Sequence, residues 1–534
     1  MPVPASRRWS TVVSAIVTSL AIIAVMVLGQ IVSSSSRSGQ PDGADSSATI
    51  LAQFQANTAL SVRTTGSLAD IKNVVLLLAD DLDWATFDAV PRLAALKEQG
   101  TTLEHFVVTN SLCCPSRASL LRSQYVHNHQ VVSNVPQTGG GWETFYNRGL
   151  EHDCLPTWLQ EAGVDTSLFG KYMNGFPGPS VARNYIPPGW DSFVTSISKN
   201  QSYKGYDYTL NRNGALQDYG HSPEDFLNDV LTKAAVDHLE SVTSPFFMEF
   251  SSYQPHTPAP VADRNLGSHL GEGVPRTPSF NVHGSNEVDW LAAQPDNTAT
   301  RVAMFDDRWR KGLESTESIA DTYDALVSEL RRAGHLDDTL ILVTSDNGYH
   351  AGTHRLGTGK NTAYREDSVV PAVLIGPGIA QGALINKVTS MVDLGPTISS
   401  LLGAATPSWV DGRSLLPLIT QQSTTPWRTA ALNERLRQTQ PGDPDYEPYQ
   451  APAFHASRSE RWLFVQYRNG EEELFDLIND PYEMDNIVTT TDPEIVRQLR
   501  QQLKALSECS GESCRVADAM PNNAMNPLPN WRRG

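Results

Sequence analysis

The sequence has 534 residues, which is enough for one large domain and a smaller one. It carries 41 Lys and Arg against 59 Asp and Glu, a net charge of −18 and a pI near 5.1, which argues against non-specific nucleic-acid binding. Because the field of the whole chain repels anions, an anionic substrate has to be attracted by a local cationic site.

The N-terminal region predicts export. Residues 11–32 carry no charged side chain, are rich in Ile, Val, Leu and Ala, and follow Arg7 and Arg8. A span of roughly 20 apolar residues can cross a bilayer, whereas the apolar part of a signal peptide usually has about 7–15, so both a membrane anchor and a signal peptide stay open. We expect a protein that is secreted or anchored on the extracytoplasmic face, with residues 33–69 as a flexible linker.

Two continuous apolar runs, residues 73–79 and 339–344, are typical of strands buried on both faces of a parallel sheet. Between them, helix-like segments such as residues 226–239 and 308–332 alternate with short strand-like ones such as 246–250. This alternation predicts an α/β fold with a mostly parallel sheet between layers of helices.

Both apolar runs end in oxygen-bearing side chains. Asp80 and Asp81 follow the first run, and Asp346 and Asn347 follow the second. Open α/β sheets bind ligands outside the carboxyl ends of their strands, and oxygen donors without His or Cys suit a hard cation, Ca²⁺ or Mg²⁺. The alternative for Asp80 and Asp81 alone is a solvated loop.

The run L-C-C-P-S-R-A-S-L-L-R at residues 112–122 predicts a loop that turns into a helix, because Pro115 suits a first helical turn. Cys113 is then expected just before the helix, where free N–H groups favour an anion. Arg117 follows one turn later, with a planar group suited to a tetrahedral oxyanion. The alternative is an ordinary buried thiol at the start of a helix.

The C-x-P-S-R pattern resembles the signature of the type I sulfatases, in which the first Cys is oxidised to Cα-formylglycine by a formylglycine-generating enzyme. The matching position is Cys113. The longer run at residues 113–129, with its doubled Cys and Y-V-H-N-H segment, most resembles the branch of N-acetylglucosamine-6-sulfatases and extracellular heparan endosulfatases.

The resemblance covers about residues 73–514 and implies an alkaline-phosphatase-like fold. The expected catalytic domain spans residues 70–425, and a small antiparallel α+β domain spans 426–517, followed by a tail at 518–534. Within the small domain, Cys509 and Cys514 enclose a short loop that could close as a disulfide in an oxidising compartment.

The resemblance also assigns roles to residues. It implies a divalent cation, usually calcium, held by Asp80, Asp81, Asp346 and Asn347 together with the modified Cys113. One hydroxyl of the hydrated formylglycine attacks sulfur while Arg117, Lys171 and Lys360 hold the sulfuryl charge. His256 or Lys360 then protonates the departing sugar oxygen. The remaining hydroxyl expels sulfate, a step that a Ser ester could not perform.

One position departs from the pattern. Many sulfatases carry a His two residues after the Lys that matches Lys171, and this His is assigned as the base for sulfate release. Here the position is Met173, which cannot act as a base. The 6-sulfatase branch also lacks this His, so activity is still expected, with His127, His350 and His256 as candidate bases.

The sequence thus predicts a sulfuric ester hydrolase acting on a sulfated amino sugar, a glycan or an aryl sulfate. One alternative is a phosphonate or phosphodiester hydrolase that uses the same aldehyde and cation. A second alternative, kept open by Met173, is a membrane-anchored glycan-binding homologue without turnover.

Overall fold

The computed structural model describes residues 66–243, 245–420, 427–443 and 445–520. The predicted signal or anchor at residues 11–32 and the predicted domain boundary at 425 lie outside these ranges. Within them, no helix combines the length and the apolar character needed to span a bilayer.

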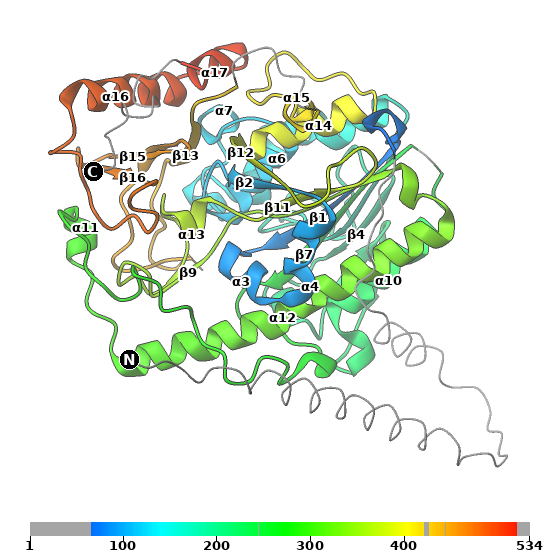
Figure 1. The fold of residues 1–534 in the computed structure, drawn as a ribbon. Helices are drawn as coiled ribbons and strands as arrows, with labels where there is room; N and C mark the ends of the chain where they lie inside the picture. Colours follow the sequence, from blue (N-terminus) through cyan, green and yellow to red (C-terminus); the bar gives the residue numbers. More distant parts are fainter. Residues whose placement is uncertain (1–65, 244, 421–426, 444, 521–534) are drawn as a thin grey trace, which may run out of the picture. The chain divides into compact units, whose positions relative to one another are not determined.

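One large mixed sheet organises the catalytic region (Figure 1). β1 pairs in parallel with β7 and β8, and β3 pairs in parallel with β7, so the centre of the sheet is parallel as predicted. In spatial order the strands are β12 (Ala383–Ser390), β2 (Thr101–Val107), β11 (Ala372–Ile375), β8 (Thr339–Ser345), β1 (Asn73–Asp80), β7 (Phe246–Pro255), β3 (Asp165–Gly170), β4 (Ser192–Ser196), β5 (Thr209–Arg212) and β6 (Ala215–Asp218).

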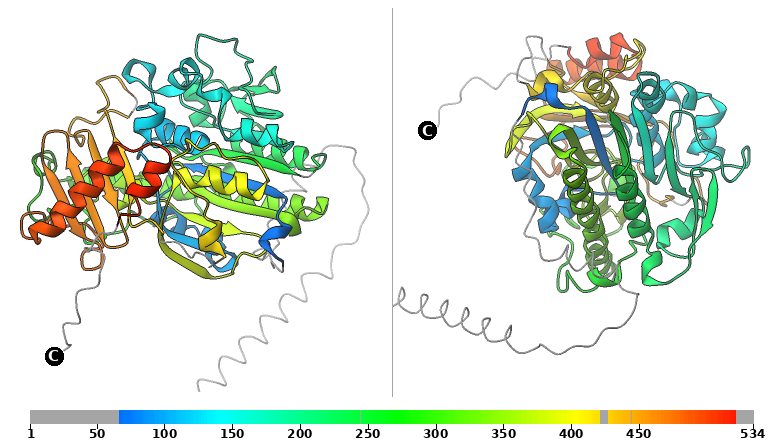
Figure 2. Two further views of the ribbon diagram at one scale, coloured as in Figure 1. Left: turned by 90° about the horizontal axis from the view of Figure 1, so that it is seen from above. Right: turned by 90° about the vertical axis from the view of Figure 1, so that its right-hand side faces the viewer.

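Alternate side chains of β1 enter two separate cores, because successive residues of a strand point to opposite faces. Val74 and Leu76 lie in one core, and Val75 and Leu77 in the other. The first core is closed by α6 (Cys113–Arg122), α8 (Gly141–Asn147), α9 (Leu155–Glu161) and α14 (Leu394–Leu401). The second is closed by α3 (Trp84–Ala89), α10 (Leu227–Leu239) and α12 (Ala299–Ala333) (Figure 2). The predicted α/β layering is confirmed.

The long helix α12 begins earlier than the apolar spacing predicted, at Ala299 and not near Arg308. The Thr298 side chain accepts the backbone N–H of Arg301 and caps the helix, and Gly334 ends it with a φ of 82°. The shorter elements are α4 (Pro91–Ala94), α5 (Leu96–Gln99), α7 (Val126–His129), α11 (Asp289–Ala292), α13 (Arg365–Ser368), α15 (Leu416–Ile419), β9 (His350–Ala351) and β10 (Thr358–Gly359).

The C-terminal region forms a four-stranded antiparallel sheet of β13 (Ala431–Arg435), β14 (Phe454–Arg458), β15 (Trp462–Tyr467) and β16 (Glu472–Asp476). One face packs under α16 (Pro493–Ser507), through Leu499 and Phe464 among others. The other face packs on the catalytic region, where Leu463 shares a core with Tyr364. Cys509, which precedes α17 (Glu512–Ala517), and Cys514, which lies within it, form the anticipated disulfide.

Candidate active site

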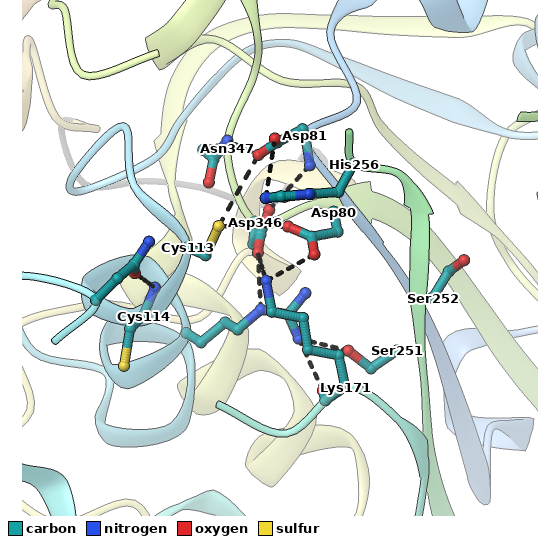
Figure 3. Close-up of polar contacts among 12 residues, drawn as sticks. Asp80, Asp81, Cys113, Cys114, Lys171, Ser251, Ser252, His256, Asp346 and Asn347 are labelled. Atoms are coloured by element: carbon teal, nitrogen blue, oxygen red, sulfur yellow. Dashed lines mark hydrogen bonds and ion pairs between the residues drawn. The ribbon is translucent and has the colours of Figure 1, made fainter. Parts of the chain in front are cut away.

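The predicted ligands and cations meet at one edge of the large sheet. This edge holds the carboxyl ends of four neighbouring strands, β8, β1, β7 and β3. Figure 3 shows side chains that gather there, among them Asp80, Asp346 and Lys171. Parallel pairing aligns these ends, since Ala79 of β1 lies opposite Ser345 of β8, and Gly170 of β3 lies opposite Ser251 of β7. The residues that follow or close these strands are Asp346 and Asn347, Asp80 and Asp81, His256, and Lys171.

The backbone at Asp81 explains how two consecutive carboxylates serve one site. Consecutive residues of a strand normally point to opposite faces. Asp81 instead has a φ of 69°, in the left-handed region that Asp tolerates better than most residues. Its Oδ1 lies 3.9 Å from the Sγ of Cys113, while the Oδ1 of Asp80 lies 3.3 Å from the same sulfur.

Helix α6 delivers Cys113 and Arg117 to this edge. Cys113 is the first residue of the helix, one position further in than predicted, and Leu112 is the capping residue. One helical turn later, the Nε of Arg117 donates to the Oδ2 of Asp346 at 2.7 Å, and its Nη1 donates to the carbonyl oxygen of Lys171 at 2.9 Å. Cys113 and the guanidinium of Arg117 therefore lie on the same helix.

Two buried lysines complete the ring of charges. The Nζ of Lys171 donates to the Oδ2 of Asp80 at 2.6 Å. The Nζ of Lys360, from the loop after β10, donates to the Oδ1 of Asp81 at 2.6 Å and lies 2.9 Å from the Sγ of Cys113. Lys360 therefore contacts Cys113 directly, and Lys171 contacts the Asp80 carboxylate that lies beside Cys113.

Charges of both signs face one another at the centre of the site. Asp80, Asp81 and Asp346 oppose Arg117, Lys171 and Lys360. Burial by itself would raise the pKa of Asp80, but the nearby cations, Lys171 foremost, outweigh burial and hold that pKa well below its ordinary value. A bound divalent cation would add two positive charges, so the site would then attract a sulfate ester despite the acidic chain.

The Cys113 side chain itself is a poor nucleophile in this setting. Burial, assisted by the Asp80 carboxylate, raises the pKa of the thiol well above its ordinary value. Because the thiolate is the reactive form of cysteine, the site holds the thiol in its unreactive form.

The oxygen donors fit a hard cation. Asn347 donates its Nδ2 to the Oδ1 of Asp81 at 2.6 Å, while its buried Oδ1 accepts no hydrogen bond from the described residues. A buried acceptor without a donor suits a cation. Donor atoms of Asp80, Asp81, Cys113 and His256 also lie within 4.8 Å of one another.

His256 stands at the open side of the site. Its Nδ1 lies 2.6 Å from the carbonyl oxygen of Thr257, so this nitrogen carries a hydrogen. Its Nε2 lies 3.7 Å from the Oδ2 of Asp81, and its side chain is 20% exposed. His256 can therefore exchange a proton at Nε2 with a group entering from solvent.

The other two candidate bases are placed differently. His127 uses both ring nitrogens, one with the Oε1 of Glu434 at 2.9 Å and one with the carbonyl oxygen of Cys509 at 2.8 Å. His350 bonds Asp367 through Nδ1, and its buried Nε2 has no partner among the described residues. Met173 is buried in the first core. The geometry favours His256 over His127 as the base, and the assignment stays a prediction.

Sequence reasoning missed one charged residue at the site. The Oδ1 of Asp445 lies 3.8 Å from the Nζ of Lys360. Its Oδ2 accepts from the Nδ2 of Asn134 at 2.7 Å, and the Oδ1 of Asn134 accepts the backbone N–H of Cys114 at 2.9 Å. Asp445 belongs to the loop between β13 and β14, and an acidic residue in a polar loop carries no periodic signal that would have singled it out.

Comparison with protein families supports one assignment. The family model described as "Sulfatase" matches residues 72–404, and the model described as "N-sulphoglucosamine sulphohydrolase, C-terminal" matches residues 352–509. Together they span both the large and the small sheet.

Curated relatives agree. The chain is 33% identical to the N-acetylglucosamine-6-sulfatase of Homo sapiens over 83% of this chain and 86% of that protein. It is 33% identical to the putative extracellular sulfatase Sulf-1 homolog of Caenorhabditis elegans over 68% of this chain and 52% of that protein. It is 29% identical to the arylsulfatase of Volvox carteri over 83% of this chain and 75% of that protein.

Solved structures share the fold. A structure described as BT4656 in complex with its substrate D-glucosamine-2-N,6-O-disulfate superposes with a TM-score of 0.69 at 19% identity, covering 84% of this chain and 99% of that one. The phosphonate monoester hydrolase of Agrobacterium radiobacter gives a TM-score of 0.62 at 20% identity, covering 82% and 96%. With the family match over residues 72–404 and relatives at 33% identity, the chain belongs to the sulfatase family and is a sulfuric ester hydrolase.

Proposed function

We propose that this sulfatase removes a sulfate ester from an amino sugar within a sulfated glycan, using a formylglycine made from Cys113 and a bound Ca²⁺. The observation that carries the proposal is the arrangement around Cys113, whose sulfur lies 3.3 Å from Asp80 and 2.9 Å from Lys360. The named activity of the relatives at 32–33% identity supports an amino-sugar 6-sulfate as the substrate class.

The proposed modification would replace an unreactive thiol with an oxygen nucleophile. The buried thiol of Cys113 is held protonated, and the cations beside it are arranged for an oxyanion. Formylglycine at this position would supply an oxygen nucleophile, and a cation held by Asp80, Asp81, Asp346 and Asn347 would lower the pKa of that nucleophile.

The remaining roles belong to side chains of this chain. Arg117, Lys171 and Lys360 present fixed positive charges to the sulfuryl oxygens. Each of these cations is already oriented by one carboxylate, which belongs to Asp346, Asp80 and Asp81, respectively. Such preorganised charges stabilise a transition state without reorganisation at the moment of reaction.

Proton transfer is assigned to His256. Its Nδ1 is fixed by the Thr257 carbonyl oxygen, so Nε2 is the nitrogen that gives a proton to the departing sugar oxygen. For compartment, we propose that the enzyme acts outside the cytoplasm, since residues 11–32 have the composition of an export signal or anchor.

The modification is tested by mass spectrometry of the peptide that contains Cys113. We expect the aldehyde in place of the thiol in active protein. We also expect Cys113→Ala to abolish turnover with an unchanged thermal midpoint, while Cys114→Ala, a change at the neighbouring buried thiol, keeps turnover. An unmodified Cys113 in fully active protein would contradict the proposal.

The substrate class is tested by comparing rates on N-acetylglucosamine 6-sulfate, 4-nitrophenyl sulfate and bis(4-nitrophenyl) phosphate. We expect the highest kcat/KM on the sugar sulfate. The phosphonate hydrolase fold neighbour makes the phosphodiester the relevant competitor, and a higher kcat/KM on it would refute the assignment.

A further inference from the structure

Two hollows with shared lining residues lie beside the loop between β13 and β14, and none of the predicted catalytic residues lines them. Their volumes are about 360 and 750 Å³, and Leu436 and Arg437 line both. Among the described residues that line them, none is Asp or Glu, and the polar ones are Arg, Gln, Asn and Thr. This composition is unusual for a chain with a net charge of −18.

Three arginines supply the charge of these hollows. Arg148 lines the smaller hollow, Arg468 the larger one, and Arg437 both. All three are exposed, and within the described part of the chain none forms an ion pair with a carboxylate. Arg437 makes one long contact, from its Nη1 to the carbonyl oxygen of Thr138 at 3.4 Å.

Two carboxylates close in sequence to the lining residues have partners of their own. Asp443 accepts the backbone N–H of Gln440 at 2.8 Å, and Glu471 accepts from the side chain of Asn469. Neither carboxylate lines the hollows or comes within ion-pairing distance of Arg437 or Arg468 in the described structure. No carboxylate of the described ranges therefore pairs with these arginines, and their positive charge is available to a ligand.

The hollows are connected to the active site through two segments. Gln137 and Thr138 line the larger hollow, and Asn134 of the same segment accepts the N–H of Cys114, next to Cys113. Asn134 also holds Asp445, which lies in the same loop as the hollow-lining Gln438. Two short segments, residues 134–138 and 438–445, therefore connect the hollows with polar groups beside Cys114 and Lys360.

We propose that these hollows form an anionic-glycan subsite, which binds the sulfate or carboxylate groups of sugar units adjoining the one that is cleaved. This rests on the proposed function, because it requires the substrate to be a sulfated glycan. Guanidinium groups bind such anions bidentately, and neighbouring amides serve the hydroxyl groups of the sugars. The enzyme then prefers sulfated oligosaccharides to single sulfated sugars.

The test compares binding of a heparin tetrasaccharide and of N-acetylglucosamine 6-sulfate to the full chain carrying Cys113→Ala, by calorimetry at two salt concentrations. Adding Arg437→Gln and Arg468→Gln is expected to weaken tetrasaccharide binding about 10-fold at low salt and to flatten its salt dependence. Monosaccharide binding is expected to stay unchanged. In chains that retain Cys113, the same two substitutions are expected to leave kcat/KM for 4-nitrophenyl sulfate unchanged.

Matched variants separate charge from structure. Arg437→Lys with Arg468→Lys keeps the charge and is expected to keep most of the tetrasaccharide affinity, while Arg148→Gln should weaken it through the other hollow. Arg331→Gln, an exposed arginine at the end of α12, should have no effect.

Two results would overturn the inference: equal tetrasaccharide affinity with and without the glutamine substitutions, or an equal loss for the monosaccharide. A wild-type chain that hydrolyses no sulfate ester would refute the proposed function instead, and the binding comparison would still report on the hollows.

Discussion

Replacing His127 by Gln distinguishes a structural role for this histidine from a role as the missing base. His127 lies on α7, where its ring contacts the Oε1 of Glu434 at 2.9 Å and the carbonyl oxygen of Cys509 at 2.8 Å. Both partners are acceptors, so both ring nitrogens must carry hydrogens and the ring is an imidazolium. Burial opposes this charge, but the bond to Glu434 prevails and raises the pKa of His127 from 6.5 to about 9.

The magnitude follows from linkage. The rise in the pKa of His127 from 6.5 to about 9 stabilises the folded state by about 3 kcal/mol at a pH where the ring is protonated in both the folded and the unfolded state. Because the folded pKa is the higher one, this stabilisation is fully present below pH 6.5 and is lost as pH rises through 9. If residues 66–520 unfold as one unit, this free energy corresponds to a shift of about 3 °C in the thermal unfolding midpoint.

The assay is thermal unfolding of wild type and His127→Gln in a pH series, with kcat/KM on 4-nitrophenyl sulfate measured beside it. We expect the midpoints to differ most near pH 6 and to converge near pH 10, with kcat/KM changed less than about threefold. A variant with an unchanged midpoint but a large loss of kcat would refute the reasoning and restore His127 as a candidate base.

Three further outcomes are expected. Asn347→Ala should weaken metal binding at least about 10-fold, measured as metal retained after dialysis. If the variant retained as much metal as wild type, Asn347 would be excluded as a ligand. Chelation should lower the turnover of wild type. Lys360→Met should lower kcat by about 10²–10³-fold, since it removes a fixed charge beside Cys113; near-normal kcat would place Lys360 outside the reaction. The double substitution Cys509→Ser and Cys514→Ser should lower the free energy of unfolding by about 2 kcal/mol, which is the loop-closure entropy of so short a loop, and leave kcat unchanged. An unchanged unfolding midpoint would show that the disulfide does not stabilise the chain.

Local patterns in the sequence were sufficient to predict much of the fold. The apolar run that became β1 is buried along its whole length, so its pattern reports the two-faced sheet directly. The helix after Leu112 follows from Pro115 and the helix formers behind it, and Cys113 was misplaced by one position because helix starts are set by capping details. The start of α12 was missed for the same reason, since Thr298 caps it outside the apolar stripe.

By itself the sequence determined the kinds of groups available to this enzyme: carboxylates at strand ends, a cysteine at a helix start, and lysines after short strands. Tertiary structure decided further contacts that no local pattern indicates. It assigned His127 to the contact with Glu434, brought Asp445 to within 3.8 Å of Lys360, and left the arginines of the hollows without an ion pair among the described residues. The physical reason is that periodicity records only whether a side chain is buried. Contacts between the catalytic region and the loop after β13 depend on the docking of two sheets far apart in the chain.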